Sequence, residues 1–395
     1  MKNRKRRGRG EGSVYQRADG LWIASISLGY DGSGKRQRLV VAGRSKREAL
    51  ETLEQKKHQV NSGAVILDAE RISVAAYLAR WLETAKERVQ PKTHLRYEQL
   101  VRLRINPALG SVQLAKLTPL HVEQLFAGLR KAGVSARGCQ MAGTMLHTAL
   151  RDAVRLRLIP NNPAREIAKP KPRKAEVQVW DRGQVLRFLD AARGDRLYAL
   201  YVLALDTGMR QGELFALRWA DFDFGAGAVL VQRSLEEING RLRVKETKSA
   251  RGRRRIDLSR FALAALHEHR KRMLADGHAE APVFCDLEGG WLRKGNVLRR
   301  SYWKVIEAAN RLDAEQAEKE QRAAKPLPFI RFHDLRHTCA TLLLLADENV
   351  KVVSERLGHA SVQLTLDTYS HVLPSMQARA AAKMDGILAG SAAVG

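Results

Sequence analysis

Apolar and polar residues alternate along the first part of the chain, and this period of two predicts β-strands. The stretch "GSVYQRADGLWIASISLGYDGSGKRQRLVVAG" contains three such runs, which are separated by Asp19-Gly20 and by residues 31–34. Asp-Gly between alternating runs is a strong signal of a hairpin. One face of the middle run is apolar and consists of Trp22, Ala24, Ile26 and Leu28. We therefore expect a three-stranded sheet.

A helix follows this sheet, because Ser45 and Glu48 form a capping box at the start of "SKREALETLEQ". Three strands and one helix predict a small separate domain over residues 12–60. A β-ribbon of this size fits the major groove of DNA, so the basic residues of its strands are candidate DNA contacts. These residues are Arg17, Lys35, Arg36 and Arg38.

Apolar residues at helical spacing dominate residues 71–168 and predict a bundle of four amphipathic helices. The predicted helices begin after Ser73, near Thr93, at Thr118-Pro119 and near Arg137, and the last runs to Ile159. The stretch "IPNNPA" then ends the bundle, since proline does not continue a helix. The polar faces are rich in Arg and Lys, so they form either a DNA-contacting face or a solvated surface.

A Pro- and Lys-rich stretch at residues 169–176 predicts a linker, which separates the bundle from a larger domain over residues 177–390. Helices dominate this domain. A β interlude of about three strands at residues 228–259 turns at Asn239-Gly240 and near Gly252. The whole pattern predicts a multidomain, mainly α-helical protein with a small β-sheet in its largest domain.

Charge points to the partner of these domains. The 395-residue chain carries 69 Lys plus Arg against 42 Asp plus Glu, a formal net charge of +27. Such an excess repels itself unless a polyanion balances it, so nucleic acid is the leading partner and an anionic membrane surface the second. No apolar run reaches the ~18 residues that span a bilayer, and the three widely separated cysteines fit a reducing cytosol. Residues 1–11 predict a disordered basic arm, which is either a solubilising tail or a source of extra phosphate contacts.

Four stretches combine residues that suit chemistry on an anion: "DTGMRQGELFALRW", "KETKSARGRR", "FHDLRHTCATLLL" and "RLGHASVQLTLDTYSHV". In the first, Arg210 follows the end of an apolar helix, and Glu213 shares its face if the next helix has begun. In the third, His333 and Arg336 are also three residues apart and face one target, whereas His337 points elsewhere and fits an ordinary surface or capping residue.

The fourth stretch presents a tyrosine at the end of a short helix. Gly358 ends the preceding helix in the left-handed conformation, which leaves His359 in a tight corner. Ser361 caps the next helix, in which Val362, Leu364 and Leu366 are expected to be partly buried. Tyr369 closes this helix.

A phosphodiester is the target that fits these side chains. A phenol with a pKa near ~10 must lose its proton before it can attack. The transition state of phosphoryl transfer then spreads negative charge over oxygens that guanidinium groups match. Arg210 and Arg336 would clamp the phosphate, and His333 would accept the phenolic proton or hold an oxygen.

Two further side chains complete this chemistry. His359 would donate a hydrogen bond, and Lys248 at the tip of a predicted hairpin would protonate the leaving 5′-oxygen. No metal or other cofactor is expected, since the sequence shows no carboxylate cluster for two magnesium ions and no G-x-x-x-x-G-K-[ST] run.

The segments "TGMRQGELFALRWADFD", "TKS", "HDLRHTCAT" and "LGHASVQLTLDTYSH" together resemble the signature of the tyrosine recombinases, the phage integrase family. The resemblance is strong over residues 177–375, the bundle is similar to the family's core-type DNA-binding domain, and residues 12–60 resemble its arm-binding domain less specifically. It implies a catalytic set in which Tyr369 forms a 3′-phosphotyrosyl link, with Glu213 as a supporting acid. The other matching positions are Arg210, Lys248, His333, Arg336 and His359.

The same resemblance implies an integrase that integrates or excises a mobile element. The expected partners are double-stranded attachment sites, a Holliday junction, three further copies in a tetramer and a DNA-bending accessory protein. No membrane partner, ATP or metal is implied, and the expected location is the cytoplasm, on DNA. Residues 375–388 predict a C-terminal helix, which packs on a neighbouring subunit in the family or on its own chain. A type IB topoisomerase-like enzyme and a catalytically silent DNA-binding regulator are the alternatives.

Overall fold

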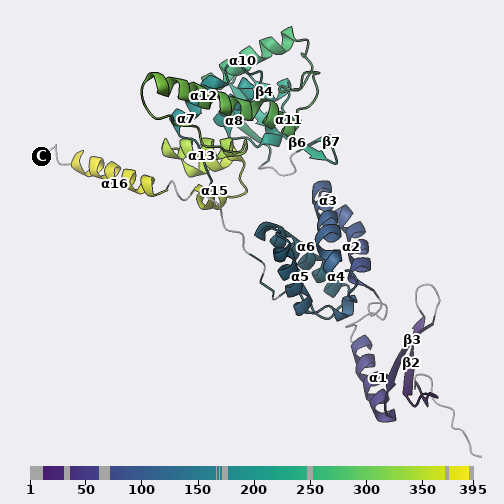
Figure 1. Ribbon diagram of the computed structural model, residues 1–395. Helices are drawn as coiled ribbons and strands as arrows, with labels where there is room; N and C mark the ends of the chain where they lie inside the picture. Colours follow the sequence, from purple (N-terminus) through teal and green to yellow (C-terminus); the bar gives the residue numbers. More distant parts are fainter. Residues whose placement is uncertain are drawn as a thin grey trace, which may run out of the picture. The chain divides into compact units, whose positions relative to one another are not determined.

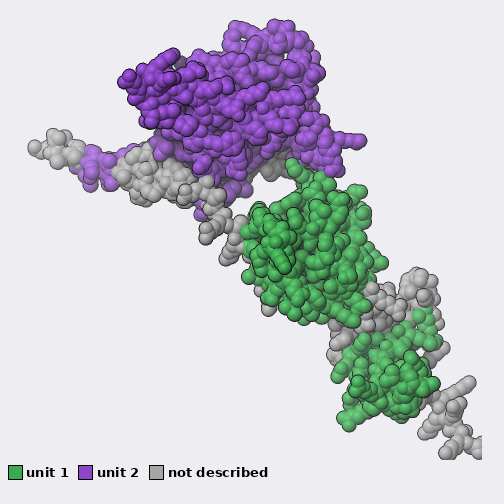
Figure 2. Space-filling model, in the orientation of Figure 1, with its two compact units in different colours: residues 1–174 green, residues 175–395 purple. Residues whose placement is uncertain are grey.

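The structure is a computed structural model that describes residues 12–30, 36–61, 72–165, 167–168, 170, 177–246, 252–369 and 373–390. It divides into two compact units, residues 1–174 and 175–395 (Figure 2). The predicted basic arm at residues 1–11 and most of the predicted linker at residues 169–176 lie outside the described residues. The finer division into domains stays a prediction.

The first unit begins with the predicted three-stranded sheet and helix. The elements are β1 (Ser13–Gln16), β2 (Trp22–Tyr30), β3 (Arg36–Gly43) and α1 (Lys46–Asn61), and the strands pair antiparallel in the order β1-β2-β3. Helix α1 covers one face, where a small core buries Ala24, Leu39, Val41, Ala49 and Leu53. At the start of α1, Ser45 accepts a hydrogen bond from the amide of Glu48, whose carboxylate accepts from the amide of Arg44.

The rest of the first unit is helical, as the pattern predicts (Figure 1). Its elements are α2 (Val74–Arg88), α3 (Pro91–Leu100), the π-helical turn η2 (Val101–Ile105), α4 (Asn106–Leu109), the 3₁₀ turn η3 (Leu114–Lys116), α5 (Pro119–Lys131) and α6 (Ala136–Arg155). Ser73 caps α2 through the amide of Ala76, and Thr118 caps α5. The second helix begins at Pro91, two residues before the predicted Thr93, because proline suits the first turn of a helix.

The last helix of this unit ends at Arg155, well before the predicted Ile159. The amide of Leu158 donates to the carbonyl of Ala153, and the amide of Arg157 donates to the carbonyl of Val154. This pair of bonds is a Schellman turn, which requires a left-handed residue, and Arg157 takes that role with φ of 59°. The helix end could not be predicted from the sequence, because arginine occupies the left-handed position where glycine is usual.

The second unit is mainly helical. Its helices are α7 (Arg182–Ala191), α8 (Tyr198–Thr207), α9 (Gln211–Phe215), α10 (Arg260–Ala275), α11 (Lys294–Val297), η5 (Leu298–Tyr302), α12 (Trp303–Lys319), α13 (Asp334–Leu345), α14 (Val350–Leu357), α15 (Val362–Tyr369) and α16 (Leu373–Gly390). The predicted C-terminal helix is thus present as α16, and Lys383 on it pairs with Asp347.

The β interlude has more strands than predicted and forms two sheets. A short 3₁₀ turn η4 (Trp219–Asp221) leads into β4 (Phe222–Asp223), β5 (Ala228–Val231), β6 (Arg233–Ile238), β7 (Arg241–Glu246) and β8 (Arg254–Asp257). One sheet has the order β4-β5-β8, and the other is the β6-β7 hairpin. The predicted turn at Asn239-Gly240 is confirmed, since both residues have positive φ, 50° and 75°.

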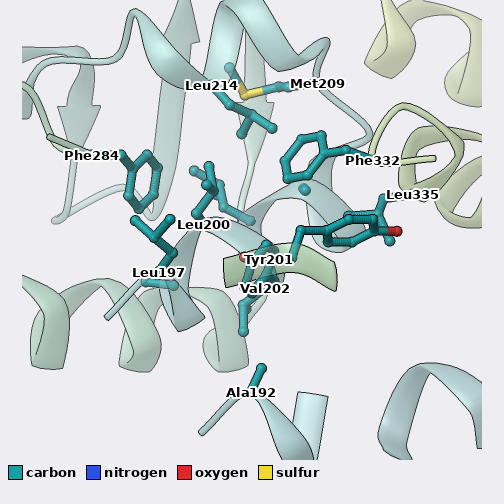
Figure 3. Close-up of a cluster of buried hydrophobic side chains, with 14 of the residues drawn as sticks. Ala192, Leu197, Leu200, Tyr201, Val202, Met209, Leu214, Phe284, Phe332 and Leu335 are labelled. Carbon is teal, nitrogen blue, oxygen red and sulfur yellow. The ribbon is translucent and has the colours of Figure 1, made fainter. Parts of the chain in front are cut away.

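A shared apolar core positions the segments that bear the candidate site. Figure 3 shows Leu200 and Tyr201 of α8 beside Phe332 and Leu335. Met209 and Leu214 are buried on either side of Arg210, and Phe332 and Leu335 are buried beside His333 and Arg336. The core therefore fixes the backbone on both sides of the two predicted arginines. Within the residues that the structure describes, no helix is both long enough and apolar enough to cross a membrane.

Candidate active site

Arg210 stands at a sharp turn between α8 and α9. Gly208 closes α8 in the left-handed conformation, with φ of 62°. A Cβ atom there would lie 2.5 Å from a side-chain carbon of Leu357, so the end of α14 packs directly on this turn. The guanidinium of Arg210 donates to Glu213 at 2.8 Å and to the carbonyl of Gly358 at 3.0 Å. The predicted pairing of Arg210 with Glu213 is present.

Glu213 is a buried carboxylate between two arginines. Besides Arg210, it accepts two hydrogen bonds from Arg254 of β8, at 2.8 and 3.3 Å. Burial opposes ionisation of this carboxyl group, but the hydrogen bond and charge of Arg254, with the charge of Arg210, outweigh it and lower the pKa of Glu213 below its usual range. Glu213 is therefore ionised at neutral pH.

Arg336 is the buried member of the predicted arginine pair, with 4% of its surface exposed. One of its terminal nitrogens donates to the carbonyls of Gly208 and Leu357, each at 2.7 Å. Burial, and then the charge of Arg210, lower the pKa of Arg336 to about 10, so the group remains charged at neutral pH. Arg210 and Arg336 thus reach the same corner, where α14 ends.

His333 and His359 lie close to these arginines. His333 precedes the first turn of α13, and burial with the charge of Arg336 lowers its pKa. His359 follows Gly358, whose φ of 67° confirms the predicted left-handed end of α14. Its Nδ1 lies 2.7 Å from the hydroxyl of Thr365, and burial with the charges of Arg336 and Arg210 lowers the pKa of His359 to about 4. Both imidazoles are therefore neutral at pH 7.

Tyr369 closes α15 and is almost wholly buried, with 1% of its surface exposed. Its ring packs in a small apolar cluster with Ala340, Leu344, Val353 and Leu357. Burial raises the pKa of the phenol, and the charge of Arg336 lowers it in part. In the structure described, the candidate nucleophile is withdrawn from solvent.

The expectation for His337 is wrong, since this residue contacts the candidate nucleophile. Its Nδ1 lies 2.9 Å from the hydroxyl of Tyr369. Burial, and then His333, lower the pKa of His337 to about 4, so the ring is neutral at pH 7 and forms a neutral hydrogen bond with the phenol. The sequence carried a signal for this role, because His333 and His337 are four residues apart and such residues share a helix face. Their rings meet edge to face at 5.4 Å between centroids.

The buried face of α15 also differs from the prediction. Ser361 caps the helix through the amide of Leu364, as expected. Leu366 is partly buried, as predicted, but Val362 and Leu364 are exposed, and the helix buries Thr365 and Tyr369 instead. These two residues are four apart, so the cap sets a register in which polar residues face inward, where Thr365 meets His359.

Arg254 is a site residue that the sequence reading missed. It stands two residues before Ile256 on β8, and residues two apart on a strand share a face. Because Ile256 is buried, this periodicity would have turned Arg254 inward. Its side chain is 8% exposed and reaches Glu213.

The remaining predicted residues are placed less fully. Lys248 and Lys35 lie outside the described residues. Arg17 lies in the turn after β1, where it pairs with Asp19 at 2.7 Å, so it is not on a strand. Arg36 and Arg38 are exposed on β3, and their contact with DNA stays a prediction.

The chemistry of the site suits an anion. Its polar groups include guanidinium groups, neutral imidazoles and a phenol, and the carboxylate of Glu213 is already held by two arginines. Among the residues that the structure describes, no group of three or more His, Cys, Asp or Glu side chains could hold a metal ion. Guanidinium groups are the side chains that best match pairs of phosphate oxygens.

Comparison with known proteins agrees with this chemistry. Residues 178–376, just over half of the chain, match the phage integrase family, and residues 73–129 match the phage integrase N-terminal SAM-like domain. The tyrosine recombinase XerC-like protein of Caldanaerobacter subterraneus subsp. tengcongensis is 27% identical over 90% of this chain and 93% of its own length. The ICEBs1 integrase of Bacillus subtilis is 23% identical over 95% of this chain and 100% of its own length.

Solved structures share the fold. The Tn1549 transposon integrase in complex with a circular intermediate DNA gives a TM-score of 0.62 at 20% identity, covering 77% of this chain and 99% of that one. A lambda integrase tetramer bound to a Holliday junction gives 0.55 at 20% identity, covering 91% and 96%.

Proposed function

This chain belongs to the phage integrase family, and on that premise we propose that Tyr369 is the nucleophile with which it cuts DNA. The protein is a site-specific recombinase of the tyrosine type, an integrase that breaks and rejoins DNA strands. One observation carries the assignment of its residues. Two arginines and a histidine converge on the end of α14, directly before the helix that bears Tyr369.

In the proposed reaction, the oxygen of Tyr369 attacks a DNA phosphorus. The bond from phosphorus to the 5′-oxygen breaks, and a 3′-phosphotyrosyl link forms. Arg210 and Arg336 donate to the non-bridging oxygens, whose negative charge grows in the transition state. Each guanidinium has five N–H donors, and the two backbone bonds of Arg336 come from a single nitrogen. The same arginine can therefore be held by the protein and still face a phosphate.

Two proton transfers accompany this step. The phenolic proton passes to a histidine, either His333, as the sequence predicts, or His337, which already contacts the hydroxyl. Lys248 gives a proton to the leaving 5′-oxygen, and His359 donates a hydrogen bond to the phosphate. Attack by the 5′-hydroxyl of a second strand then reverses the step and rejoins the DNA.

The burial of Tyr369 sets a requirement on this reaction. A hydroxyl with 1% exposure on its residue cannot reach a phosphate from the position described. We infer that α15 shifts when DNA binds, so that the ring leaves the cluster with Ala340 and Leu344. Because α15 is only eight residues long, such a shift requires little rearrangement of the rest of the unit.

The partner of the reaction is double-stranded DNA at attachment sites. The fold shared with an integrase tetramer on a Holliday junction supports assembly of four copies of this chain around such a junction. The likeness to a transposon integrase and to the ICEBs1 integrase supports action on a mobile element. We also propose a DNA-bending accessory protein as a partner of this reaction.

A nicked suicide substrate tests the assignment. The wild-type protein should become covalently attached to the 3′-phosphate, and Tyr369→Phe should abolish attachment while DNA affinity changes less than about twofold. An adduct formed by the Phe variant would refute Tyr369 as nucleophile. Relaxation of supercoiled DNA without strand exchange between paired sites would instead favour a topoisomerase-like enzyme.

A further inference from the structure

Arg254 has no place in the reaction described above, although it is among the most firmly held cations of the second unit. Its side chain is 8% exposed, and the carboxylate that it meets is 4% exposed. The fork of Arg254 takes both oxygens of Glu213, and its Nε donates to the carbonyl of Arg356 at 2.8 Å. A charge is kept in such an enclosed place only when a partner offsets the loss of solvent.

Arg254 and Arg210 share one carboxylate but differ in exposure. The side chain of Arg210 is 43% exposed, which allows it to meet a DNA phosphate. The side chain of Arg254 is buried, so it cannot contact DNA directly. Glu213 thus connects an exposed arginine to a buried one, and the position of its carboxylate fixes where the Arg210 guanidinium lies.

The backbone at the end of α14 also holds these arginines. Three successive carbonyls each accept from a different arginine: Arg356 from Arg254, Leu357 from Arg336 and Gly358 from Arg210. The last carbonyls of a helix lack partners within it and carry partial negative charge. They therefore hold three cations side by side.

Arg254 also closes the corner that carries His359. A Cβ atom on Gly358 would lie 2.9 Å from a terminal nitrogen of Arg254, so the guanidinium packs against this glycine. His359 is the next residue, and its amide donates to the carbonyl of Ser354. The side chain of Arg254 thus contacts both Glu213, which holds Arg210, and Gly358, which precedes His359.

We propose that Arg254 is a positioning residue for DNA cleavage, which aims Arg210 through Glu213 and sets the His359 corner through the end of α14. This inference rests on the proposed function of those two residues. Without the fork, Glu213 keeps only one arginine on its carboxylate, and the phosphate-facing guanidinium gains freedom. A misplacement of this kind lowers a catalytic rate by up to about 100-fold.

Arg254→Lys tests the proposal, because lysine keeps the charge and most of the volume but lacks the planar fork. We expect the single-turnover rate of adduct formation on the nicked substrate, at saturating protein, to fall about 10–100-fold. DNA affinity should stay within about threefold, since the side chain does not face DNA. The matched control is Arg255→Lys, on the same strand with a side chain that is 57% exposed, which should cleave at the wild-type rate.

A pH profile separates positioning from general loss of structure. The charged groups that face Glu213 are Arg210 of the α9 turn, Arg254 of β8 and Arg336 of α13, while β6 presents Ser234 and the backbone of Leu235 to this helix. Removal of Arg254 raises the pKa of the Glu213 carboxyl, so this group becomes protonated earlier as the pH is lowered. Cleavage by Arg254→Ala should therefore be lost at a higher pH than cleavage by the wild type when both are acidified. In a Glu213→Gln background, Arg254→Ala should cause no further shift, and its loss of rate should be smaller than in the wild type, because only the contact with the end of α14 is left to lose.

Each outcome decides a point. Wild-type cleavage by Arg254→Lys, or fully additive losses with Glu213→Gln, would overturn the proposal. If the Tyr369→Phe variant still formed the adduct, the proposed function itself would fail, whatever Arg254 does. If Tyr369→Phe is inactive while Arg254→Lys and Arg254→Ala cleave normally, only the positioning role is lost.

Discussion

The two halves of the candidate active site are built in opposite ways. The half that we propose to face the phosphate, the rigid half, is held by charged hydrogen bonds, with Arg210, Arg254 and Arg336 fixed by Glu213 and by the end of α14. The half that bears the proposed nucleophile, the nucleophile half, is a short helix whose tyrosine is buried among aliphatic side chains and contacts His337. The hydrogen bonds of the rigid half are all formed in the structure described, whereas the nucleophile half holds its reactive group buried.

This difference has a physical reason. Stabilising a transition state requires donors that do not reorganise during the reaction, so the cations gain from a rigid frame. A nucleophile that makes a covalent link to DNA must instead be delivered to the phosphate at the right moment. Apolar packing and a neutral hydrogen bond are easier to exchange than a buried ion network, since the latter leaves unpaired charge when it is broken.

The rigid half should fail most severely when its buried arginine is changed. Arg336→Lys removes a planar donor that bridges two backbone carbonyls, and we expect cleavage of the nicked substrate to fall about 10²–10³-fold. DNA affinity, measured by titration at fixed salt, should change little. A variant that cleaves within about threefold of the wild type would show that this half is not the one that stabilises the reaction.

The contact between α8 and α14 offers a second way to disturb the rigid half. Gly208→Ala combines a left-handed φ of 62° with a Cβ only 2.5 Å from Leu357, so we expect a loss of stability beyond the ~1–2 kcal/mol of the left-handed conformation alone and a cleavage rate about 10-fold lower. The matched control is Gly277→Ala, where φ is 76° and no atom lies within 4 Å of the added carbon. Equal thermal unfolding of the two variants would contradict the close packing.

A substitution in the nucleophile half should change the accessibility of Tyr369 more than the stability of the protein. His337→Ala removes the hydrogen bond to the phenol, so nitration of Tyr369 in the DNA-free protein should become a few-fold faster, as measured by mass spectrometry of the peptide. Tyr201, which is buried and bonds to Ser301 in the main core, should keep its rate and serves as the internal control. An unchanged rate at Tyr369 would mean that His337 does not hold it.

The smallest effect concerns pH and stability. Burial lowers the pKa of His337 and of His359 to about 4, below the ordinary value of 6.5. Protonation therefore favours the unfolded chain, so the stability that these groups contribute is complete above pH 6.5 and is lost as pH falls toward 4. With partial solvent screening, each should lower the free energy of unfolding by on the order of 1 kcal/mol at pH 5. The double variant His337→Gln/His359→Gln should show a flatter decline in denaturant titrations between pH 7 and 5, and an equal decline would refute this origin.

Local signals in the sequence were sufficient for the frame of the site. Gly358 could be predicted as a left-handed helix end because glycine takes positive φ without strain, and the three-residue spacing predicted that Arg210 and Glu213 share a face. Arg157 could not be predicted in the same way, since its left-handed conformation is stabilised by the closing turn of α6 and not by its residue type.

Contacts between distant segments were harder to read. Arg254 and Glu213 are 41 residues apart, and the sequence offers only the alternation on β8 as a hint. His337 and Tyr369 are 32 residues apart, and their contact depends on how α15 packs against α13. The number of strands in the β interlude was likewise underestimated, because β6 and β7 form a hairpin of their own while β5, which also pairs with β4, reaches across them to pair with β8.

The structure of the Tyr369→Phe protein bound to a DNA duplex with its attachment site would test the central claim most directly. The account predicts that Arg210 and Arg336 donate to oxygens of one phosphate with their backbone partners at α14 unchanged, and that the ring of residue 369 has left the cluster with Ala340 and Leu344 to face that phosphate. Arginines on two different phosphates, or a ring still buried beside His337 with the phosphate bound elsewhere, would contradict it.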